Sequence, residues 1–317
     1  MVFVNQGRQI STTGTLTSWE YGGGINGFAI SGSNHHDVWC GNCGTGVWYM
    51  FADIWSISLT SDGNATDTGG NDLRGGYIGG AVSGVTHSYT ADGTGQGGSS
   101  NQISRFSNTS PGSGSSDVGD LTTTVNRGVG ISSIGNGHGY HGHGTTLQKY
   151  AFGSSSSATN VSSLVNNHGT SVPSSSSDGG NNYGYVAGGS APATNAISRF
   201  SFDNEATKND VGDLATSAAS YCGGSSETNG YHFAGGNIYR YAFANSSSGS
   251  DVGNLLNSST SRGTGFSSTT HSYASGGGVH ETHMEKFAHA SDSTSSFVGN
   301  LGTGQTTNRT GHVSTHY

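Results

Sequence analysis

The sequence predicts an all-β protein, and its composition is the first reason. The 317 residues include 56 Gly and only 3 Pro, while 9% are charged and 30% are hydrophobic. The 14 Tyr, 12 Phe and 4 Trp are spread along the chain and the net charge is only −8, which is not the composition of a disordered chain. Gly, Ser, Thr and Asn between regularly placed aromatic residues are typical of short strands joined by tight turns. The sequence also lacks sustained helical periodicity, so we expect strands throughout.

The composition also argues against several kinds of partner. No run approaches the roughly 18 apolar residues that a membrane-spanning helix needs. The first residues, MVFVNQGRQIS, lack the basic and apolar regions of a secretory signal. We therefore expect synthesis in a cytosol and no membrane insertion. The 3 Cys are too few for a disulfide framework, and the 11 Lys and Arg form no basic cluster, so we expect no nucleic-acid partner.

An internal repeat is the second reason. One phrase, NAISRFSFDNEATKNDVGDL at 195–214, has relatives such as NIYRYAFANSSSGSDVGNL at 237–255. Each ends in a leucine, and these leucine marks are Leu16, Leu73, Leu121, Leu164, Leu214, Leu255 and Leu301. A second mark with the same spacing is a tyrosine before a Gly-rich step, at Tyr89, Tyr140, Tyr185, Tyr231, Tyr273 and Tyr317. A repeat of roughly 40–50 residues with several short strands predicts the blade of a β-propeller.

The elements of one repeat follow a fixed order. The tyrosine mark and its glycines form one strand, and an apolar-x-basic-aromatic phrase forms the next. A variable loop, a Val-Gly-Asp/Asn-Leu segment and a Gly-x-Ser-Ser strand complete the unit. Because successive strand residues point to opposite faces, we expect the apolar and the aromatic positions to pack on different neighbouring blades. The apolar positions are Ile103, Leu147, Ile197, Ile238 and Met284, and the aromatic ones are Phe106, Tyr150, Phe200, Tyr241 and Phe287.

This order resembles a kelch repeat, with its glycine pair, aromatic-rich strand, apolar anchor and Arg-bearing segment. The sequence departs from the kelch pattern where that family usually has Trp, because valines stand there instead. These valines are Val118, Val161, Val211, Val252 and Val298. The resemblance covers nearly the whole chain and implies a kelch-like β-propeller.

The chain ends indicate the expected blade number. The last residues, GHVSTHY, match only the strand that leads into the tyrosine mark, and VFVNQ, RQIS and Leu16 match the remaining parts of a unit. We therefore expect a seven-bladed propeller spanning 1–317 as a single domain. In this prediction the N- and C-terminal strands pair within one blade and close the ring, which removes exposed sheet edges.

A basic residue recurs two positions after the apolar one. These residues are Arg105, Lys149, Arg199, Arg240 and Lys286. They either pair with carboxylates of the DVGD-type segments, or cover a blade face with their aliphatic stems, or form a ring of cations for an anionic ligand. The expected carboxylates are Asp117, Asp120, Asp210, Asp213 and Asp251. We favour the pairing, because a specific ligand site usually breaks the symmetry of the repeat.

Two histidine-containing stretches are candidate metal sites. NHHDVWCGNC at 34–43 supplies His35, His36, Cys40 and Cys43, which are possible tetrahedral zinc ligands. The second ligand pair of a zinc finger normally lies a dozen or more residues away, and neighbouring histidines in a strand point in opposite directions. A reduced or disulfide-linked loop is the alternative for this stretch.

The second stretch is GHGYHGHG at 137–144, and short His-rich tracts are associated with metal binding. Aligned on the repeat, however, Tyr140 is a tyrosine mark, and His138 shares its strand face. His141 and His143 are too few to form a site without a further ligand. We therefore expect no metal and no cofactor.

The candidate ligand-binding residues are aromatic side chains in the irregular first unit. They are Trp39, Trp48, Tyr49 and Trp55. Low charge with many hydroxyl and amide groups suits hydrogen bonding to glycans, and aromatic rings serve as stacking platforms. The variable loops are expected to carry further contact residues. The alternative is that this aromatic group is only a local core.

The Gly/Ser/Asn-rich, charge-poor array with GY..GG and ISRF phrases resembles repeat proteins encoded by tailed phages. The resemblance implies a non-enzymatic virion protein, in a tail fibre or on the capsid surface. Such a protein would contact other virion proteins and attach to a host-surface glycan or protein. One alternative is an intracellular kelch scaffold. The other is a sugar-active or copper enzyme, for which Tyr221 beside Cys222 is the only trace of the required Tyr–Cys pair.

Overall fold

The structure is a computed structural model of the chain. It describes residues 3–5, 8–10, 16–19, 26–32, 51–59, 61–68, 73–74, 80–84, 86–95, 98–124, 128–168, 174–178, 182–189, 193–206, 208–217, 222–245, 248–256, 264–268, 270–275, 282–300, 310–311 and 313–314. Before residue 51 and after residue 300 only the backbone is described. The described elements are β-strands and one 3₁₀ turn, so the predicted all-β class is confirmed.

Five antiparallel sheets of four consecutive strands form the blades of a β-propeller. Blade 1 contains β8 (Gly80–Ser83), β9 (His87–Gly95), β10 (Gly98–Ser107) and β11 (Ser116–Asp120). Blade 2 contains β12 (Val129–Ser133), β13 (His138–His143), β14 (Thr146–Ala151) and β15 (Thr159–Ser163). Blade 3 contains β16 (Ser174–Asp178), β17 (Tyr183–Ala187), β18 (Ala196–Ser201) and β19 (Lys208–Asp213).

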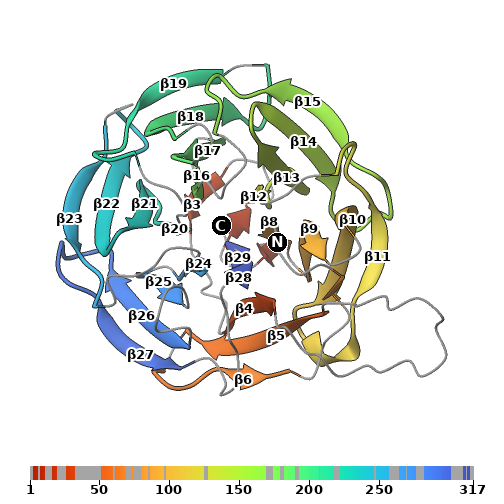
Figure 1. Ribbon diagram of the computed structural model, residues 1–317, viewed down its shortest axis with the longest axis horizontal. Coiled ribbons are helices and arrows are strands. Elements are labelled where there is room, and N and C mark those ends of the chain that lie inside the picture. Colours follow the sequence, from red (N-terminus) through yellow and green to blue (C-terminus); the bar gives the residue numbers. More distant parts are fainter. Residues whose placement is uncertain are drawn as a thin grey trace.

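The last two blades have the same order. Blade 4 contains β20 (Cys222–Ser225), β21 (Asn229–Ala234), β22 (Asn237–Ala242) and β23 (Ser250–Asn254). Blade 5 contains β24 (Thr264–Ser267), β25 (His271–Ser275), β26 (His283–Ala288) and β27 (Ser296–Asn300). In each blade the first strand lies nearest the centre of the ring and the fourth lies on the rim (Figure 1). The 3₁₀ turn η1 (Pro111–Ser113) lies between β10 and β11.

The remaining strands combine segments from both parts of the chain. A further sheet has the order β28 (Thr310–Gly311), β4 (Asn26–Gly32), β5 (Phe51–Ser58) and β6 (Thr66–Asp67), and β7 (Leu73–Arg74) also pairs with β5. This sheet, called the β4–β6 sheet below, occupies the sector between blades 5 and 1 (Figure 1). The strand β29 (Val313–Ser314) pairs in parallel with β8 and also contacts β4, β12 and β24. It therefore lies near the axis of the ring.

The predicted number of seven blades is wrong, and the described strands do not show the predicted closure. β1 (Phe3–Asn5), β2 (Arg8–Ile10) and β3 (Leu16–Trp19) make a separate three-stranded sheet. In the described chain these strands pair only with one another, whereas the prediction joined residues 2–16 to residues 311–317. Leu16 therefore lies in this meander, and Leu73 lies in β7 rather than at the end of a four-stranded blade. Strands that are close in sequence pair most readily, and a leucine period does not reveal which strands pair.

The hydrophobic core lies between blades rather than within them. One cluster joins Val82, Tyr89 and Ile103 of blade 1 to Tyr150 of blade 2. The same kind of cluster recurs between the following blades and between blade 5 and the β4–β6 sheet. The apolar and aromatic strand positions named from the sequence are all buried, as predicted. The leucine marks Leu121, Leu164, Leu214 and Leu255 are also buried, while Leu301 lies outside the described residues. Each blade thus depends on its neighbours to bury its apolar surface.

Candidate functional site

The tyrosine marks pack against the next blade. The rings of Tyr89 and Tyr185 lie nearly parallel to Phe152 and Phe243 of the following blades, with centroids 5.0 and 4.7 Å apart. Tyr231 stacks in the same way on His289, at 5.0 Å. In each pair the partner stands two residues after the aromatic strand position of its own blade. These rings fix where the next blade's outer loop begins.

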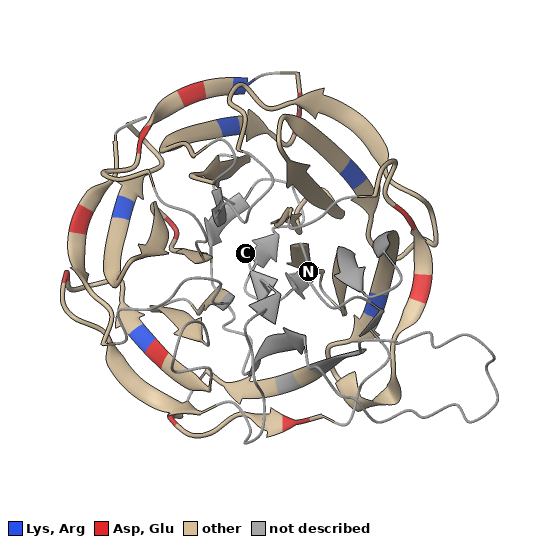
Figure 2. Cartoon of the chain, viewed as in Figure 1, with Lys and Arg blue, Asp and Glu red and all other residues tan. Residues whose placement is uncertain are grey.

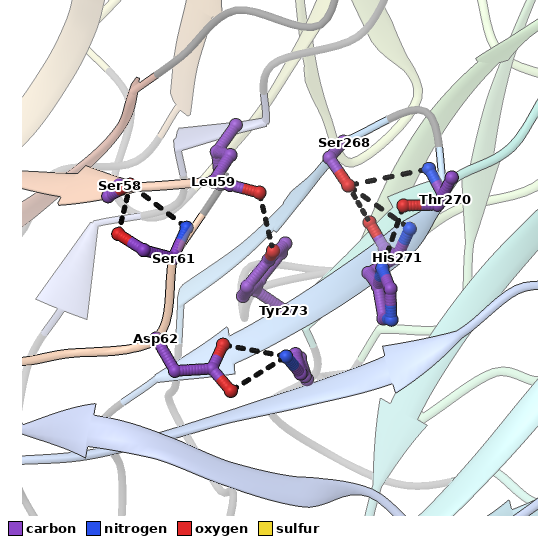
Figure 3. A network of polar contacts seen from close by, with 9 residues as sticks. Ser58, Leu59, Ser61, Asp62, Ser268, Thr270, His271 and Tyr273 are labelled. Atoms are coloured by element: carbon purple, nitrogen blue, oxygen red, sulfur yellow. Dashed lines mark hydrogen bonds and ion pairs between the residues drawn. The ribbon is translucent and has the colours of Figure 1, made fainter.

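The tyrosine hydroxyls reinforce the same contacts. The backbone N–H of Gly153 donates to the Tyr89 hydroxyl at 2.9 Å, and the Tyr273 hydroxyl donates to the Leu59 carbonyl at 3.5 Å (Figure 3). The Tyr140 hydroxyl donates to Glu205 at 3.1 Å. Burial, together with the nearby Glu205 carboxylate, holds the pKa of Tyr140 far above its usual value. The Tyr140 hydroxyl therefore acts as a neutral hydrogen-bond donor.

The recurring basic residues lie on the third strand of each blade, and the acidic residues of the outer strands and loops lie nearer the rim (Figure 2). Three of them form ion pairs with the next sheet. Lys149 Nζ lies 2.6 Å from Glu205 Oε1, Arg240 Nη1 lies 2.7 Å from Asp292 Oδ1, and Lys286 Nζ lies 2.6 Å from Asp62 Oδ1. Figure 3 shows the contacts of Asp62. In each of these loops, one residue contacts the tyrosine mark of the preceding blade. The carboxylate belongs to the residue three positions later in the sequence.

Pairing of the basic residues therefore occurs, but not with the expected carboxylates. Asp117, Asp210 and Asp251 instead accept hydrogen bonds from the backbone N–H two residues ahead in their own strands, at 3.0–3.2 Å. The Asp120 and Asp213 carbonyls accept hydrogen bonds from the next blade's Ala158 and Gly249. The DVGD segment thus contacts the next blade through its backbone carbonyl. The carboxylate of its first aspartate stabilises the local bend of the edge strand.

Two arginines have no such carboxylate. In the sequence, the position matching Glu205, Asp292 and Asp62 is Ser155 in the loop that follows the Arg105 blade and Ser246, outside the described residues, in the loop that follows the Arg199 blade. The Arg199 guanidinium instead lies 4.5 Å from the Tyr183 ring centroid. Arg105 lies near His87, and burial and the charge of Arg105 both lower the pKa of His87. Within the described part of the chain, neither arginine forms an ion pair.

The residue between the apolar and basic positions holds the preceding connection in place. In blade 2, Gln148 Oε1 accepts a hydrogen bond from the Thr122 N–H at 2.7 Å. In blade 5, Glu285 Oε2 accepts hydrogen bonds from the Leu256 N–H at 2.8 Å and from the Ser295 hydroxyl at 2.5 Å. Glu285 is 2% exposed, and it is the one carboxylate in a position occupied elsewhere by Ser104, Gln148, Ser198 and Tyr239. It is therefore a structural tether rather than an accessible acid.

Two buried histidines are held neutral. The ring nitrogens of His168 lie 2.7 Å from the Gly188 carbonyl and 2.8 Å from the Ser198 hydroxyl. Burial lowers the pKa of His168 to about 4 even though that carbonyl favours protonation. Burial also lowers the pKa of His232 to about 3. Both imidazoles are uncharged at neutral pH and lie in the blade packing, so they are poorly placed to exchange protons with a ligand.

The side chains of the ligand-binding and metal-binding candidates in the first unit are not described by the structure. Trp39, Trp48 and Tyr49 lie outside the described residues, as do the possible metal ligands His35, His36, Cys40 and Cys43. Trp55 lies in β5, where its backbone pairs with Ala29 and Asp67. The ligand-binding prediction for these residues stays a prediction.

Within the second histidine stretch, His141 faces blade 1 while Tyr140 packs against blade 3. His141 is 1% exposed, and its ring lies where a Cβ on Gly128 would come within 2.2 Å of Nε2. Glycine at position 128 thus makes room for the ring. His143 is half-buried, and burial and the neighbouring His141 both lower its pKa. Across the described ranges, no three His, Cys, Asp or Glu side chains come together as metal ligands.

Cys222 does not provide a reactive thiol. The residue is fully buried in the blade 4 interface, and burial, assisted by the Glu285 charge, raises the pKa of its thiol to about 12. A thiolate, the form that attacks a carbon or binds a metal, is therefore scarce at neutral pH. Tyr221 lies outside the described residues.

The residues that the sequence did not indicate are the carboxylates at blade junctions and the Glu285 tether. Their signal lies in the variable loops: after three of the five blades that supply a basic residue, an acid stands three positions after the residue that contacts the tyrosine mark, and after the other two a serine stands there. Comparison of one loop with the next, without regard to the neighbouring blade, does not reveal this correlation.

No known protein family model matches the chain, and no curated protein sequence matches it either. Among the described elements, no helix is long and apolar enough to cross a membrane.

Proposed function

We propose that the protein is a non-enzymatic attachment module of a virion, which presents its rim loops to a host-surface glycan and contacts other virion proteins. The observation that carries the proposal is the character of the outer loops of blades 1 and 2. Residues 109–110 and 112–113 are exposed, as are 153–157, and neither loop contains a charged residue. Serine and threonine hydroxyls supply both donors and acceptors, which suits the hydroxyl groups of a sugar.

The blade 2 loop is anchored at both ends. Phe152 is stacked on Tyr89, and the Ala158 N–H donates to the Asp120 carbonyl at 2.7 Å. A loop that is already ordered loses less conformational entropy when a ligand binds. Rigid display of neutral polar groups therefore favours a binding role.

The environment of the ionisable groups disfavours catalysis. A general acid or base works best with a pKa near the working pH and with access to substrate. Five of the described groups depart from this, because Lys149 and Lys286 are paired to carboxylates and His168, His232 and Cys222 are buried. These five groups thus take part in the packing of the sheets.

The virion assignment rests on sequence resemblance. The chain shares its glycine pairs, Arg-bearing strands and Ser/Asn-rich loops with kelch-like arrays, and its low charge and GY..GG phrases with repeat proteins of tailed phages. We place the protein in a tail fibre or on the capsid surface of such a particle. Its detection by mass spectrometry in purified virions would test this, and its presence only in the soluble fraction of infected cells would contradict it.

The glycan proposal is tested with the full chain on a glycan array. We expect selective binding to one glycan class. Replacement of Thr109, Ser110 and Ser113, or of Ser154, Ser155 and Ser156, by Ala should weaken that binding, because these changes remove hydroxyls while Ser157, which accepts the Asp120 N–H, is kept. Binding to no glycan, or reproducible cleavage of a glycan, would overturn the proposal. Binding unchanged in both loop variants would place the contact surface elsewhere and contradict the rim as the binding surface.

A further inference from the structure

The blade junctions contain a recurring slot for a carboxylate. At three junctions a lysine or arginine on the third strand faces a carboxylate from the next sheet's outer loop, with nitrogen–oxygen distances of 2.6–2.7 Å. The loop is held in each case by the side chain that stands beside the tyrosine mark. The cation and the ring contact therefore define one geometric position for a carboxylate group.

The junction between blades 1 and 2 has the same framework without the carboxylate. Tyr89 stacks on Phe152 at 5.0 Å as Tyr231 stacks on His289, so the loop begins at the same ring contact, and the Tyr89 hydroxyl also accepts a hydrogen bond from the Gly153 N–H at 2.9 Å. The position of the carboxylate is taken by Ser155, which is exposed. Arg105 is only partly buried and forms no ion pair within the described ranges.

The residues beside Arg105 also match those at a junction where the basic residue is paired with a carboxylate. The Thr86 hydroxyl lies 2.8 Å from His87 Nδ1, and the Thr270 hydroxyl lies 2.8 Å from His271 Nδ1 beside the Lys286–Asp62 pair. Figure 3 shows the filled slot, with Thr270, His271 and Asp62 around Tyr273. The junction of Arg105 thus keeps the cation, the histidine and the ring contact, and lacks only the anion.

We propose that the slot formed by Arg105, His87 and Ser155 binds the carboxylate of an acidic sugar. The inference rests on the proposed glycan-binding function and names its ligand class. A guanidinium can hold a carboxylate through two parallel hydrogen bonds, and the exposed serines 154–156 of the same loop carry hydroxyls that suit the sugar ring. The net charge of −8 does not oppose this strongly, because at 0.15 M salt charges beyond about 8 Å are screened.

The test uses the full chain and two matched probes, glucuronate and its neutral amide, glucuronamide. NMR titration should show glucuronate shifting the signals of His87 and of residues near Arg105, with glucuronamide binding at least about tenfold more weakly. Arg105→Gln should weaken glucuronate binding by about the same factor. Equal affinity for the two probes would overturn the proposal.

Two further variants test the slot without removing the arginine. Ser155→Asp places an internal carboxylate opposite Arg105, as Asp292 stands opposite Arg240, and should abolish glucuronate binding while the protein stays folded. Asp292→Ser opens an equivalent slot at Arg240 and should add a second binding site for glucuronate. Glucuronate binding that survives Ser155→Asp would contradict the proposal.

The outcomes separate this inference from the proposed function. An array with uronic-acid, sialylated, sulfated and neutral glycans identifies the source of the anion. Selective binding of neutral glycans alone supports the attachment function and contradicts the carboxylate slot. Glucuronate binding that Ser155→Asp abolishes, without binding to any glycan on the array, supports the slot and contradicts glycan attachment.

Discussion

Single residues in this protein act mainly on a neighbouring blade. A lysine, a tyrosine hydroxyl or a buried glutamate each meets a group from the next or the preceding sheet, as in the Lys149–Glu205 and Glu285–Leu256 contacts. An exposed ion pair contributes only about 0–1 kcal/mol to stability. The residues with larger effects are those that are wholly buried, and the histidines among them couple stability to pH.

Stability should decrease as the pH falls below 6.5. The folded-state pKa values of His168 and His232 are about 4 and about 3, against 6.5 in the unfolded chain. Above pH 6.5 both states are neutral and the full stability is present. Between pH 6.5 and about 4 the unfolded chain binds more protons, so each histidine lowers the free energy of unfolding by up to about 1.4 kcal/mol per pH unit. Urea denaturation from pH 7.5 to 4.5 measures this dependence.

His232→Val should flatten that dependence. Val186 occupies the same strand position in blade 3, directly after the tyrosine mark, and is fully buried. The variant should lose part of the slope between pH 6.5 and 4.5, because one of the two histidines with the most strongly lowered pKa is gone. His87→Val, which alters a partly exposed histidine, serves as the control and should leave most of the slope. An unchanged slope in His232→Val would show that this histidine is not held neutral by burial.

A residue-scale test of the junction pairs uses Ser155→Asp. The new carboxylate should pair with Arg105 and raise the free energy of unfolding by about 0.2–1 kcal/mol. Thermal unfolding of Ser155→Asp, Arg105→Gln and the double variant forms a cycle that isolates the pair. A coupling free energy of zero in this cycle would contradict the assignment of Ser155 to the carboxylate position.

At the scale of elements, backbone contact between an edge strand and the next loop decides how blades fit together. Gly299 in β27 approaches the β4–β6 sheet so closely that a Cβ there would lie 2.2 Å from the Gly63 carbonyl oxygen. Gly119 in β11 approaches Ser156 of blade 2 in the same way and has φ = 147°. The glycine of the Val-Gly segment is therefore required by contact with the neighbouring sheet.

Gly299→Ala should destabilise the protein, and Gly63→Ala should not. The first adds a Cβ against backbone that cannot move without separating the sheets, at a cost of about 1–3 kcal/mol as for other overpacked sites. The second adds a Cβ with nothing within 4 Å, on the other side of the same contact. Midpoints of urea unfolding for the two variants provide the comparison. Equal midpoints would mean that the contact is readily relaxed.

The sequence predicted which strand faces are buried, but it did not predict correctly which strands pair. Ile103 and Phe106 could be assigned to buried faces because the strand period acts locally and repeats in every blade. The blade number could not be obtained from Leu16 and Leu73, because the strands that contain them pair with neighbours outside the repeat. Glu205 and Asp292 were missed because their positions are constrained by the previous blade and not by their own loop. Ligand binding by Trp39, Trp48, Tyr49 and Trp55 remains a prediction.

For the whole molecule, the division of the core between blades makes stability a shared property. Phe200 of blade 3 is fully buried and packs 5.3 Å from the Tyr140 ring of blade 2. Phe202 completes the contact at 5.2 Å. Loss of either side of such an interface exposes apolar surface on two blades.

Phe200→Ala should destabilise both blades that meet at this ring. A truncation of this kind costs about 3–5 kcal/mol. Hydrogen exchange should accelerate in β13 and β14 of blade 2 as well as in β17 and β18 of blade 3, because the two blades share one cluster. Phe297→Ala, which truncates a side chain that is 48% exposed, is the control and should change exchange little. Acceleration confined to blade 3 would contradict the shared core.

The contact between blade 5 and the β4–β6 sheet has a consequence for the order of folding. The Asn300 N–H donates to Asn64 Oδ1 at 3.0 Å although the two residues are 236 positions apart, and the Ala65 N–H donates back to the Asn300 carbonyl at 2.8 Å. Each four-stranded blade, by contrast, forms from neighbouring segments with small loop-closure entropy. Contacts between distant segments form late, because their entropy must be lost before they contribute. During synthesis, the blades can therefore fold one after another on the ribosome. The contact between blade 5 and the β4–β6 sheet can form only after Asn300 has emerged.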